Sequence, residues 1–228
     1  MEKSGFRHEI KHYINYSDYL SLRNRLRVVI NSDSNVDNVG KYKIRSIYFD
    51  NLQDKVLREK IYGINNREKF RIRYYNEDSS FIKLEKKSKV NGLCSKISTI
   101  ITRDQCEKIL NGDIKWMKKS EDALMVELYT KMNYQQLKPK TIVDYVREPY
   151  VYRTGNVRIT IDSEIKTGVY SKDLFNQDLP VIECDSKGII ILEVKYDEFL
   201  PNIIKDIIQI NNRRQSSFSK YAACRVFG

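Results

Sequence analysis

The sequence predicts an α+β fold in which a closed antiparallel β-barrel with a charged lumen is flanked by α-helices. Three observations lead to this prediction. Many short alternating segments are interspersed with a few amphipathic ones, several of these segments carry charge on one face, and no repeat or linker divides the 228 residues. We therefore expect a single domain over residues 1–228.

The strands are predicted by alternation of polar and apolar residues, or by enrichment in β-branched and aromatic residues. We expect them at residues 5–14, 41–49, 55–62, 67–76, 80–89, 95–102, 141–152, 156–162 and 188–196. Clusters of polar residues at 31–40 and 76–80 are expected to be loops between them. Many strands with few helices are typical of an antiparallel α+β fold.

Five segments space their apolar residues as amphipathic helices do. In the first, Ser17 is the expected N-cap. The second opens with Thr102 and Gln105 in capping-box spacing and is expected to end at Gly112. The remaining helices are expected at residues 120–132, after residue 201 and at 218–226.

Charge falls on one face of several predicted strands, because successive side chains of a strand point to opposite sides. In residues 69–74, Lys69, Arg71 and Arg73 share a face, and the residues between them are apolar or aromatic. His8 and His12 fall on an apolar face and are expected to pack in the core. The same parity groups Arg7, Glu9 and Lys11; Lys83, Glu85, Lys87 and Lys89; Arg158, Thr160 and Asp162; and Glu193 and Lys195.

These charged faces are expected to line the barrel lumen. A charged face of an antiparallel sheet usually meets solvent. Here, however, the amphipathic helices need an apolar outer surface to cover, which leaves the Arg-rich faces inside. Like charges about 4 Å apart repel by roughly 4 kcal/mol at an effective dielectric near 20, so such a lumen favours a bound anion.

Composition limits the protein's class. The formal charge of +11 and the pI near 9.3 suit a partner that is a polyanion, whether nucleic acid, anionic lipid or a phosphate compound. No apolar run approaches the roughly 20 residues of a membrane span, and the first residues lack a signal-peptide pattern. The four cysteines are widely spaced, which indicates reduced thiols rather than disulfides or zinc ligands: they are Cys94, Cys106, Cys184 and Cys224. We therefore expect a soluble, cytoplasmic protein.

Seven segments, in order along nearly the whole chain, resemble the VTC domain. This domain is the catalytic module of vacuolar transporter chaperone polyphosphate polymerases and of bacterial relatives, within the triphosphate tunnel metalloenzyme superfamily. Each segment alone is a weak signal, whereas seven in order are a specific one. They are RHEIK at 7–11, IYFDN at 47–51, KFRIR at 69–73, LEKK at 84–87 with NG at 91–92, VRITID at 157–162, ILEVK at 191–195 and FSK at 218–220.

The resemblance implies a polyphosphate polymerase that transfers the γ-phosphate of ATP to the end of an inorganic polyphosphate chain. It implies Mn²⁺ or Mg²⁺ as the cofactor and ATP and polyphosphate as the ligands, with no nucleic acid expected. Carried over by position, the catalytic residues are Lys11, Arg71, Arg73, Lys87, Arg158 and Lys220, with Ser219 as a further phosphate-binding residue and Glu193 as the metal ligand. The charged faces add Arg7, Glu9, Lys69 and Lys195 as substrate-binding residues.

Two acidic residues have a second interpretation. Glu193 could serve as the ion-pair partner of Lys195 or of another lumenal base instead of holding a metal. Glu9 is also expected to balance the charge of neighbouring lysines and arginines. Ser219 lies at the start of the last predicted helix, where free N–H groups favour an anion.

One departure from the superfamily's pattern favours a polymerase. Tunnel enzymes that hydrolyse triphosphates usually open with Glu-x-Glu-x-Lys, whereas this chain has Arg7-x-Glu9-x-Lys11. Fewer carboxylates bind divalent ions more weakly, and more bases bind phosphate more strongly. The alternatives are a tripolyphosphatase or nucleoside triphosphatase of the same fold, and a non-catalytic polyphosphate- or RNA-binding module. In an RNA-binding module, Tyr42, Tyr74 and Tyr75 could stack on bases.

Overall fold

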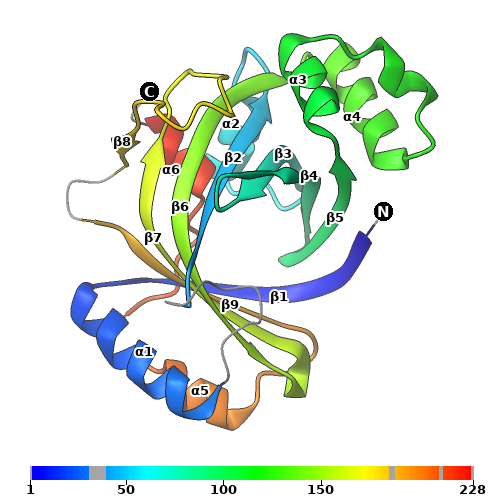
Figure 1. Ribbon diagram of the computed structural model, residues 1–228. Coiled ribbons are helices and arrows are strands. Elements are labelled where there is room, and N and C mark those ends of the chain that lie inside the picture. Colours follow the sequence, from blue (N-terminus) through cyan, green and yellow to red (C-terminus); the bar gives the residue numbers. More distant parts are fainter. Residues whose placement is uncertain (1, 31–39, 185–187, 211–212, 227–228) are drawn as a thin grey trace.

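The chain folds around one antiparallel sheet whose two edges meet (Figure 1). The computed structural model describes residues 2–30, 40–184, 188–210 and 213–226, so the polar cluster predicted at 31–40 lies almost entirely outside the described residues. Within these ranges, eight strands pair in the order β6-β2-β3-β4-β5-β1-β9-β7, and β7 pairs back to β6, which closes a barrel as predicted.

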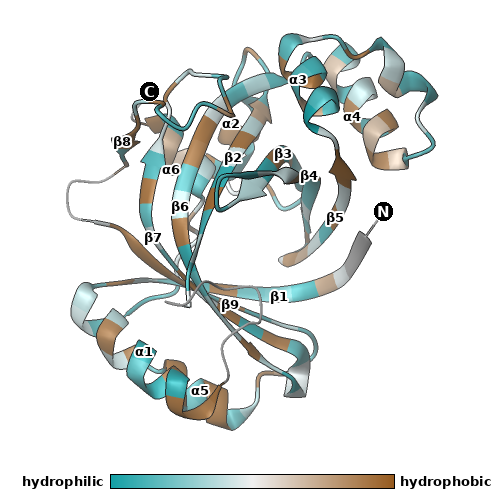
Figure 2. Ribbon diagram, in the orientation of Figure 1, coloured by the Kyte–Doolittle hydropathy of each residue, from teal (hydrophilic) through white to brown (hydrophobic). Residues whose placement is uncertain are grey.

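The barrel strands agree closely with the predicted segments, apart from residues 55–62. They are β1 (Glu2–Ile14), β2 (Tyr42–Asp50), β3 (Arg67–Tyr75), β4 (Asp78–Val90), β5 (Leu93–Ile101), β6 (Lys138–Tyr152), β7 (Val157–Thr167) and β9 (Ile190–Tyr196). A short strand that was not predicted, β8 (Ile182–Glu183), pairs with the end of β7. Figure 2 shows polar and apolar residues alternating along the barrel strands, which is the pattern that predicted them.

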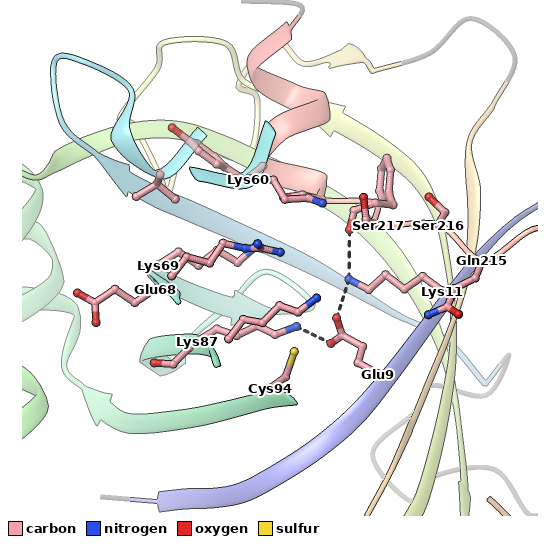
Figure 3. Close-up of a pocket in the computed structure, with 17 residues that line it drawn as sticks. Glu9, Lys11, Lys60, Glu68, Lys69, Lys87, Cys94, Gln215, Ser216 and Ser217 are labelled. Atoms are coloured by element: carbon pink, nitrogen blue, oxygen red, sulfur yellow. Dashed lines mark hydrogen bonds and ion pairs between the residues drawn. The ribbon is translucent and has the colours of Figure 1, made fainter. Parts of the chain in front are cut away.

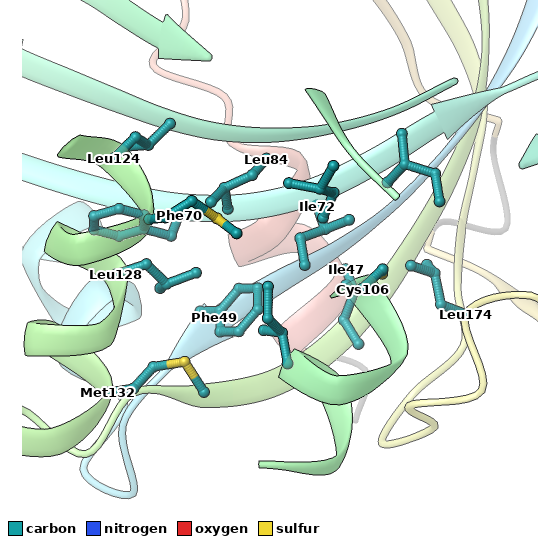
Figure 4. Close-up of a cluster of buried hydrophobic side chains, with 14 of the residues drawn as sticks. Ile47, Phe49, Phe70, Ile72, Leu84, Cys106, Leu124, Leu128, Met132 and Leu174 are labelled. Atoms are coloured by element: carbon teal, nitrogen blue, oxygen red, sulfur yellow. The ribbon is translucent and has the colours of Figure 1, made fainter. Parts of the chain in front are cut away.

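Helices cover two parts of the outer surface. On one, α3 (Arg103–Asn111), the 3₁₀ turn η1 (Lys115–Lys119) and α4 (Ala123–Tyr134) bury the apolar faces of β2, β3 and β4 (Figure 4). On the other, α1 (Tyr16–Val29) and α5 (Asn202–Ile208) pack over β7 and β9. The 3₁₀ turn η2 (Thr154–Asn156) joins β6 to β7. No helix in the described ranges is long and apolar enough to cross a membrane.

Side-chain caps set where these helices begin. Thr102 and Gln105 form the predicted capping box of α3, and Gly112 ends that helix with a left-handed φ of 84°. The N-cap of α1 is Asn15 and not Ser17, because Asn15 accepts a hydrogen bond from the Asp18 N–H and returns one to the Asp18 carboxylate. This reciprocal pair satisfies two free donors, which a cap at residue 17 would leave exposed.

The strand predicted at residues 55–62 is wrong: Lys55–Ile61 form helix α2. The Asp50 carboxylate accepts hydrogen bonds from the N–H groups of Val56 and Leu57, and the Asn51 side chain accepts one from Lys55. Acceptors supplied by the end of β2 therefore satisfy the free donors of a first helical turn. The alternation over eight residues was too short to outweigh this local capping.

The barrel interior is charged on the strand faces for which charge was predicted, but it is not charged throughout. Helix α6 (Lys220–Val226) packs against α2 and against β6 and β7. Its Tyr221 and Cys224 belong to a buried cluster with Tyr48 and Val143 from the inner faces of β2 and β6. One sector of the interior is therefore apolar and filled by the C-terminal helix. The rest forms the lumen.

Candidate active site in the barrel lumen

All twelve predicted site residues line one cavity of about 290 Å³ inside the barrel. The strand members point inward by alternation, and Ser219 and Lys220 reach the same space from the start of α6. Eleven lysines or arginines and two glutamates are among the cavity-lining residues of the described chain, so the lumen is strongly basic. The twelve predicted site residues in this cavity are Arg7, Glu9, Lys11, Lys69, Arg71, Arg73, Lys87, Arg158, Glu193, Lys195, Ser219 and Lys220.

Arg71 and Arg73 reach from β3 to the carboxylate of Glu85 on β4. The Nε and Nη2 atoms of Arg71 lie 2.9 and 2.7 Å from Glu85 Oε2, and Arg73 Nη2 lies 2.8 Å from Glu85 Oε1. Burial would raise the pKa of Glu85, but the two guanidinium groups lower it overall, so the carboxylate is ionised. One negative charge thus holds two arginines in place and leaves a net positive charge for a ligand.

Glu9 and Glu193 lie among the ammonium groups of three lysines. Lys11 Nζ lies 3.1 Å from Glu9 Oε1 and 3.2 Å from Glu193 Oε2, while Lys87 pairs with Glu9 and Lys195 with Glu193. Burial raises the pKa of both carboxyl groups, yet the surrounding lysines lower it below the usual range. Glu193 therefore makes the ion pairs that its second interpretation expected.

Lys220 enters the lumen from α6 and is held by Asp162 on β7. The Asp162 carboxylate accepts a hydrogen bond from Lys220 and two from Arg147, whose Nε and Nη2 atoms lie 2.6 and 2.8 Å away. Tyr145 lies beside both cations, with its ring centre 4.6 Å from Lys220 Nζ. Although burial raises the pKa of the Tyr145 phenol, Arg147, Lys220 and Arg71 lower it overall.

A second cavity, of about 390 Å³, adjoins the lumen and shares Lys11, Lys69 and Lys87 with it. Its further basic residues are Lys60 from α2, Arg67 from the start of β3 and Lys89 from the end of β4. Figure 3 shows the side chains of Lys60, Lys69, Lys87 and Lys11 extending toward a common space. We call this second cavity, lined by Lys60, Arg67, Lys69 and Lys89, the basic mouth.

The basic mouth has little internal charge balance. Glu9, which pairs with Lys11 and Lys87, and Glu68 also line this cavity. No carboxylate in the described parts of the chain forms an ion pair with Lys60, Arg67, Lys69 or Lys89, and in the β3–β4 ladder Arg67 lies opposite Lys89. Burial, together with the charges of Arg67, Lys11 and Lys89, lowers the pKa of Lys60 to about 8. Burial and the neighbouring cations also lower the pKa of Lys69 well below its usual value. Both shifts reflect uncompensated positive charge around the two lysines, which a bound anion would neutralise.

Buried polar atoms in the lumen indicate where a ligand would bind. Within the described residues, Thr160 Oγ1 and Arg73 Nε have no hydrogen-bond partner although they are buried. Thr160 lies directly opposite Glu193 in the β7–β9 ladder. Buried groups of this kind are normally satisfied, so they fit a site completed by phosphate oxygens or by water.

The donor set fits a divalent cation only together with a bound phosphate. The described residues contain no group of three His, Cys, Asp or Glu side chains that could enclose a metal. Glu193 places a carboxylate in the lumen, and Glu9 forms an ion pair with the same lysine, Lys11. Mg²⁺ is commonly held by one or two carboxylates plus substrate phosphates, and this arrangement suits these two residues.

Several lumenal residues were not singled out by sequence reasoning. Tyr48, Lys96, Tyr145 and Arg147 line the lumenal cavity, and Lys60 and Arg67 line the basic mouth beside it. Tyr145 and Arg147 alternate with an apolar residue on β6, and this alternation was a signal that could have been found. Lys60 could not be found in this way because its segment was predicted as a strand. His8, expected in the core, is exposed and stacks on Tyr196 with ring centres 5.0 Å apart.

Comparison with solved structures shows the same fold. A putative adenylyl cyclase from Hippeastrum, described as having a dominant triphosphatase activity, is 14% identical, with a TM-score of 0.58 over 100% of this chain and 96% of that chain. A putative adenylate cyclase from Bacillus halodurans is 12% identical, with a TM-score of 0.54 over 86% of this chain and 82% of that one. None of the curated proteins matches the chain.

The family comparison covers almost the whole sequence. The VTC domain matches residues 6–227, a range that includes every residue of the lumenal cavity. The inward-facing Arg and Lys side chains and the closed barrel agree with the expectations that the resemblance raised. The chain therefore belongs to the VTC domain family, and its fold is that of the triphosphate tunnel proteins.

Proposed function

We propose that this protein is a polyphosphate polymerase that transfers the γ-phosphate of ATP to the end of a polyphosphate chain. The observation that carries the proposal is the continuity of the basic lumen with the basic mouth through Lys11, Lys69 and Lys87. A triphosphate needs one row of cations, whereas a donor nucleotide and a polymeric acceptor together need a longer one. The two adjoining cavities supply that length.

Arginines are well suited to hold the donor. Arg71, Arg73 and Arg158 lie on β3 and β7 and reach the lumen from different sides of the barrel. A planar guanidinium can donate two hydrogen bonds to one phosphate, and Arg73 retains an unpartnered Nε. Lys87 adds a further charge to the same group of residues. We place the triphosphate of ATP on these four side chains.

The acceptor chain end belongs near Lys11 and Lys220, with the rest of the chain extending into the basic mouth. An ionised oxygen of the terminal phosphate attacks the γ-phosphorus of ATP and forms the new P–O bond. The bond from the γ-phosphorus to the bridging β–γ oxygen breaks, and ADP leaves with that electron pair. The second pKa of a phosphate monoester is about 6, so the attacking oxygen needs no general base near neutral pH.

The protein's contribution to this transfer is alignment and charge neutralisation. Lys11 bridges Glu9 and Glu193, so it is held at a fixed place between the donor and acceptor positions. Asp162 fixes Lys220 in the same way. A Mn²⁺ or Mg²⁺ ion held by Glu193 and the phosphates would supply further neutralisation of the transferring group.

The test is incubation of the purified protein with ATP and Mn²⁺ or Mg²⁺, followed by separation of the products. The proposal expects phosphate chains longer than three units, with one ADP released for each phosphate added to a chain. Release of orthophosphate without longer chains would instead identify the second candidate, a tripolyphosphatase or nucleoside triphosphatase. The triphosphatase activity described for the Hippeastrum protein of the same fold supports that candidate.

A non-catalytic RNA-binding module has less support. Of the three tyrosines expected to stack on bases, Tyr42 and Tyr74 are buried, and the Tyr74 hydroxyl donates to the Leu174 carbonyl, so neither ring is available. Only Tyr75 is partly exposed, and a single ring does not make a binding surface for a strand of RNA. Oligonucleotide binding that resists competition by short polyphosphate would favour this module over both enzymes. The enclosed lumen suits a thin chain of phosphates better than a base-bearing strand.

A further inference from the structure

The inward-facing residues of β3 and β4 change character from one end of the barrel to the other. Along β3 they are Arg67, Lys69, Arg71, Arg73 and Tyr75, and along β4 they are Lys89, Lys87, Glu85, Lys83 and Phe81. Both rows begin at the basic mouth and end in an aromatic ring. Arg67 and Tyr75 are separated by about 26 Å along the strand.

The aromatic end is directly continuous with the phosphate-binding arginines. Arg73 Cζ lies 5.1 Å from the centre of the Tyr75 ring, and the Arg158 guanidinium donates to the Tyr42 hydroxyl at 3.3 Å. Tyr42 packs edge-on against Tyr75, with ring centres 5.7 Å apart. Tyr42 is buried, so its contact with Tyr75 holds that ring beside Arg73.

Phe81 is the exposed member of this cluster. Its ring centre lies 6.4 Å from that of Tyr75, and Lys83 Nζ lies 5.0 Å from the Phe81 ring. The Phe81 side chain is 40% exposed. An aromatic ring left partly open beside a row of phosphate-binding cations has no packing role that would require its exposure.

We propose that Tyr75 and Phe81 form a nucleobase-binding subsite, so that the nucleoside of ATP lies at the aromatic end and its γ-phosphate points toward the basic mouth. This inference rests on the proposed function, because it assumes that the arginines hold a nucleoside triphosphate. The growing chain then occupies the basic mouth, opposite the nucleoside.

The chemistry of a nucleotide matches this order of residues. Neighbouring same-face residues on a strand are about 7 Å apart, which is comparable to the span of the ribose between the α-phosphate and the base. With the α-phosphate at Arg73, the base therefore reaches Tyr75 and Phe81. Stacking on an aromatic ring is open to every base, so the subsite distinguishes a nucleotide from a bare triphosphate and not one base from another.

The test compares ATP with tripolyphosphate, which has the phosphates but no base. Dissociation constants are measured by calorimetry without divalent metal, for the wild type and the variants Phe81→Ala, Phe81→Leu and Ile100→Ala. Ile100 is a matched control because it lies opposite Lys83 at the same end and is 63% exposed but not aromatic. The variant Phe81→Trp tests whether any aromatic ring at this position suffices for ATP binding.

The subsite predicts that Phe81→Ala and Phe81→Leu weaken ATP binding about tenfold and leave tripolyphosphate binding within twofold. Ile100→Ala and Phe81→Trp should bind both ligands as the wild type does. Equal effects of Phe81→Ala on the two ligands, or no effect on either, would overturn the subsite while leaving the lumen's phosphate site in place. If the wild type bound neither ligand, the proposed function itself would fail, and the subsite with it.

Discussion

Lys69 and Lys87 face each other across the β3–β4 ladder, in register and both on the lumenal side. Lys87 pairs with Glu9, whereas in the described ranges Lys69 has no carboxylate partner and lies 5.3 Å from the Tyr48 ring centre. Like charges opposite each other destabilise a sheet. The pair is therefore strained by repulsion in the free protein and relieved by a bound anion.

The first prediction is that tripolyphosphate binding takes up protons. Burial and the charges of Lys87, Lys11 and Arg71 lower the pKa of Lys69, and a phosphate beside it would raise that pKa again. Where the pH lies above the lowered pKa, binding must add a proton, so affinity falls as pH rises. Calorimetry in buffers of different ionisation enthalpy measures the uptake. Lys69→Met should reduce it, and an unchanged uptake in this variant would contradict the role of Lys69.

The same pair predicts opposite effects on stability. Lys69 has a lowered pKa, so its charge destabilises the fold most at pH values below that pKa. This destabilisation is relieved as pH rises from the lowered pKa toward the ordinary pKa of lysine. Lys87 has a raised pKa, because Glu9 outweighs its burial, so its charge favours the fold until pH exceeds that pKa. At neutral pH, Lys69→Met should stabilise and Lys87→Met destabilise, each by about 1 kcal/mol in urea unfolding. Shifts of the same sign in both variants would contradict this account.

Arg73 gives a prediction about synthesis. Arg73→Ala should lower the rate of polyphosphate formation by about 10²- to 10³-fold, because it removes a guanidinium that holds and aligns the triphosphate of ATP. Arg71 still pairs with Glu85 in this variant, so the barrel should remain folded. Arg73→Lys, which keeps the charge but loses the planar fork, should recover part of the rate. Circular dichroism confirms the fold, and full activity in Arg73→Ala would remove this residue from the site.

Glu193 gives a prediction about the metal. Glu193→Gln keeps the shape of the side chain but removes the charged oxygen, so the Mn²⁺ or Mg²⁺ concentration that gives half-maximal activity should rise at least tenfold. If Glu193 serves only as the ion-pair partner of Lys11 and Lys195, the maximal rate should fall while the metal titration stays unchanged. Activity measured over a metal series separates the two roles.

The sequence predicted the lumenal strands well because strand parity is a local property. Arg71 and Arg73 face inward for the same reason that Ile72 between them is buried under α3 and α4. Lys60 was missed because its segment is a helix and not a strand, and this depends on Asp50, whose carboxylate at the end of β2 caps the helix. Arg147 shared the alternation of its strand with Tyr145, but its buried partner Asp162 lies on the next strand of the chain, and the register that pairs the two residues was not predicted.

Lys60 and Arg67 allow the basic mouth to be tested separately from the lumen. Both line it, but the pKa of Lys60 is lowered to about 8, whereas an arginine stays charged across the working range. The Lys60 charge is therefore present below pH 8 and lost above it. Lys60→Met should weaken binding of long polyphosphate by about tenfold at pH 7 and by much less at pH 9, since the wild type has by then lost the same charge.

Arg67→Met is the matched control for this comparison. It should weaken binding of long polyphosphate by a similar factor at pH 7 and pH 9, because it removes a charge that does not titrate. Tripolyphosphate, which is short enough to be held by the lumenal arginines, should be affected little by either variant. Dissociation constants for both ligands at both pH values decide the matter. If the dissociation constants of Lys60→Met and Arg67→Met for long polyphosphate changed in parallel with pH, Lys60 would not be the residue that makes polyphosphate binding pH-sensitive.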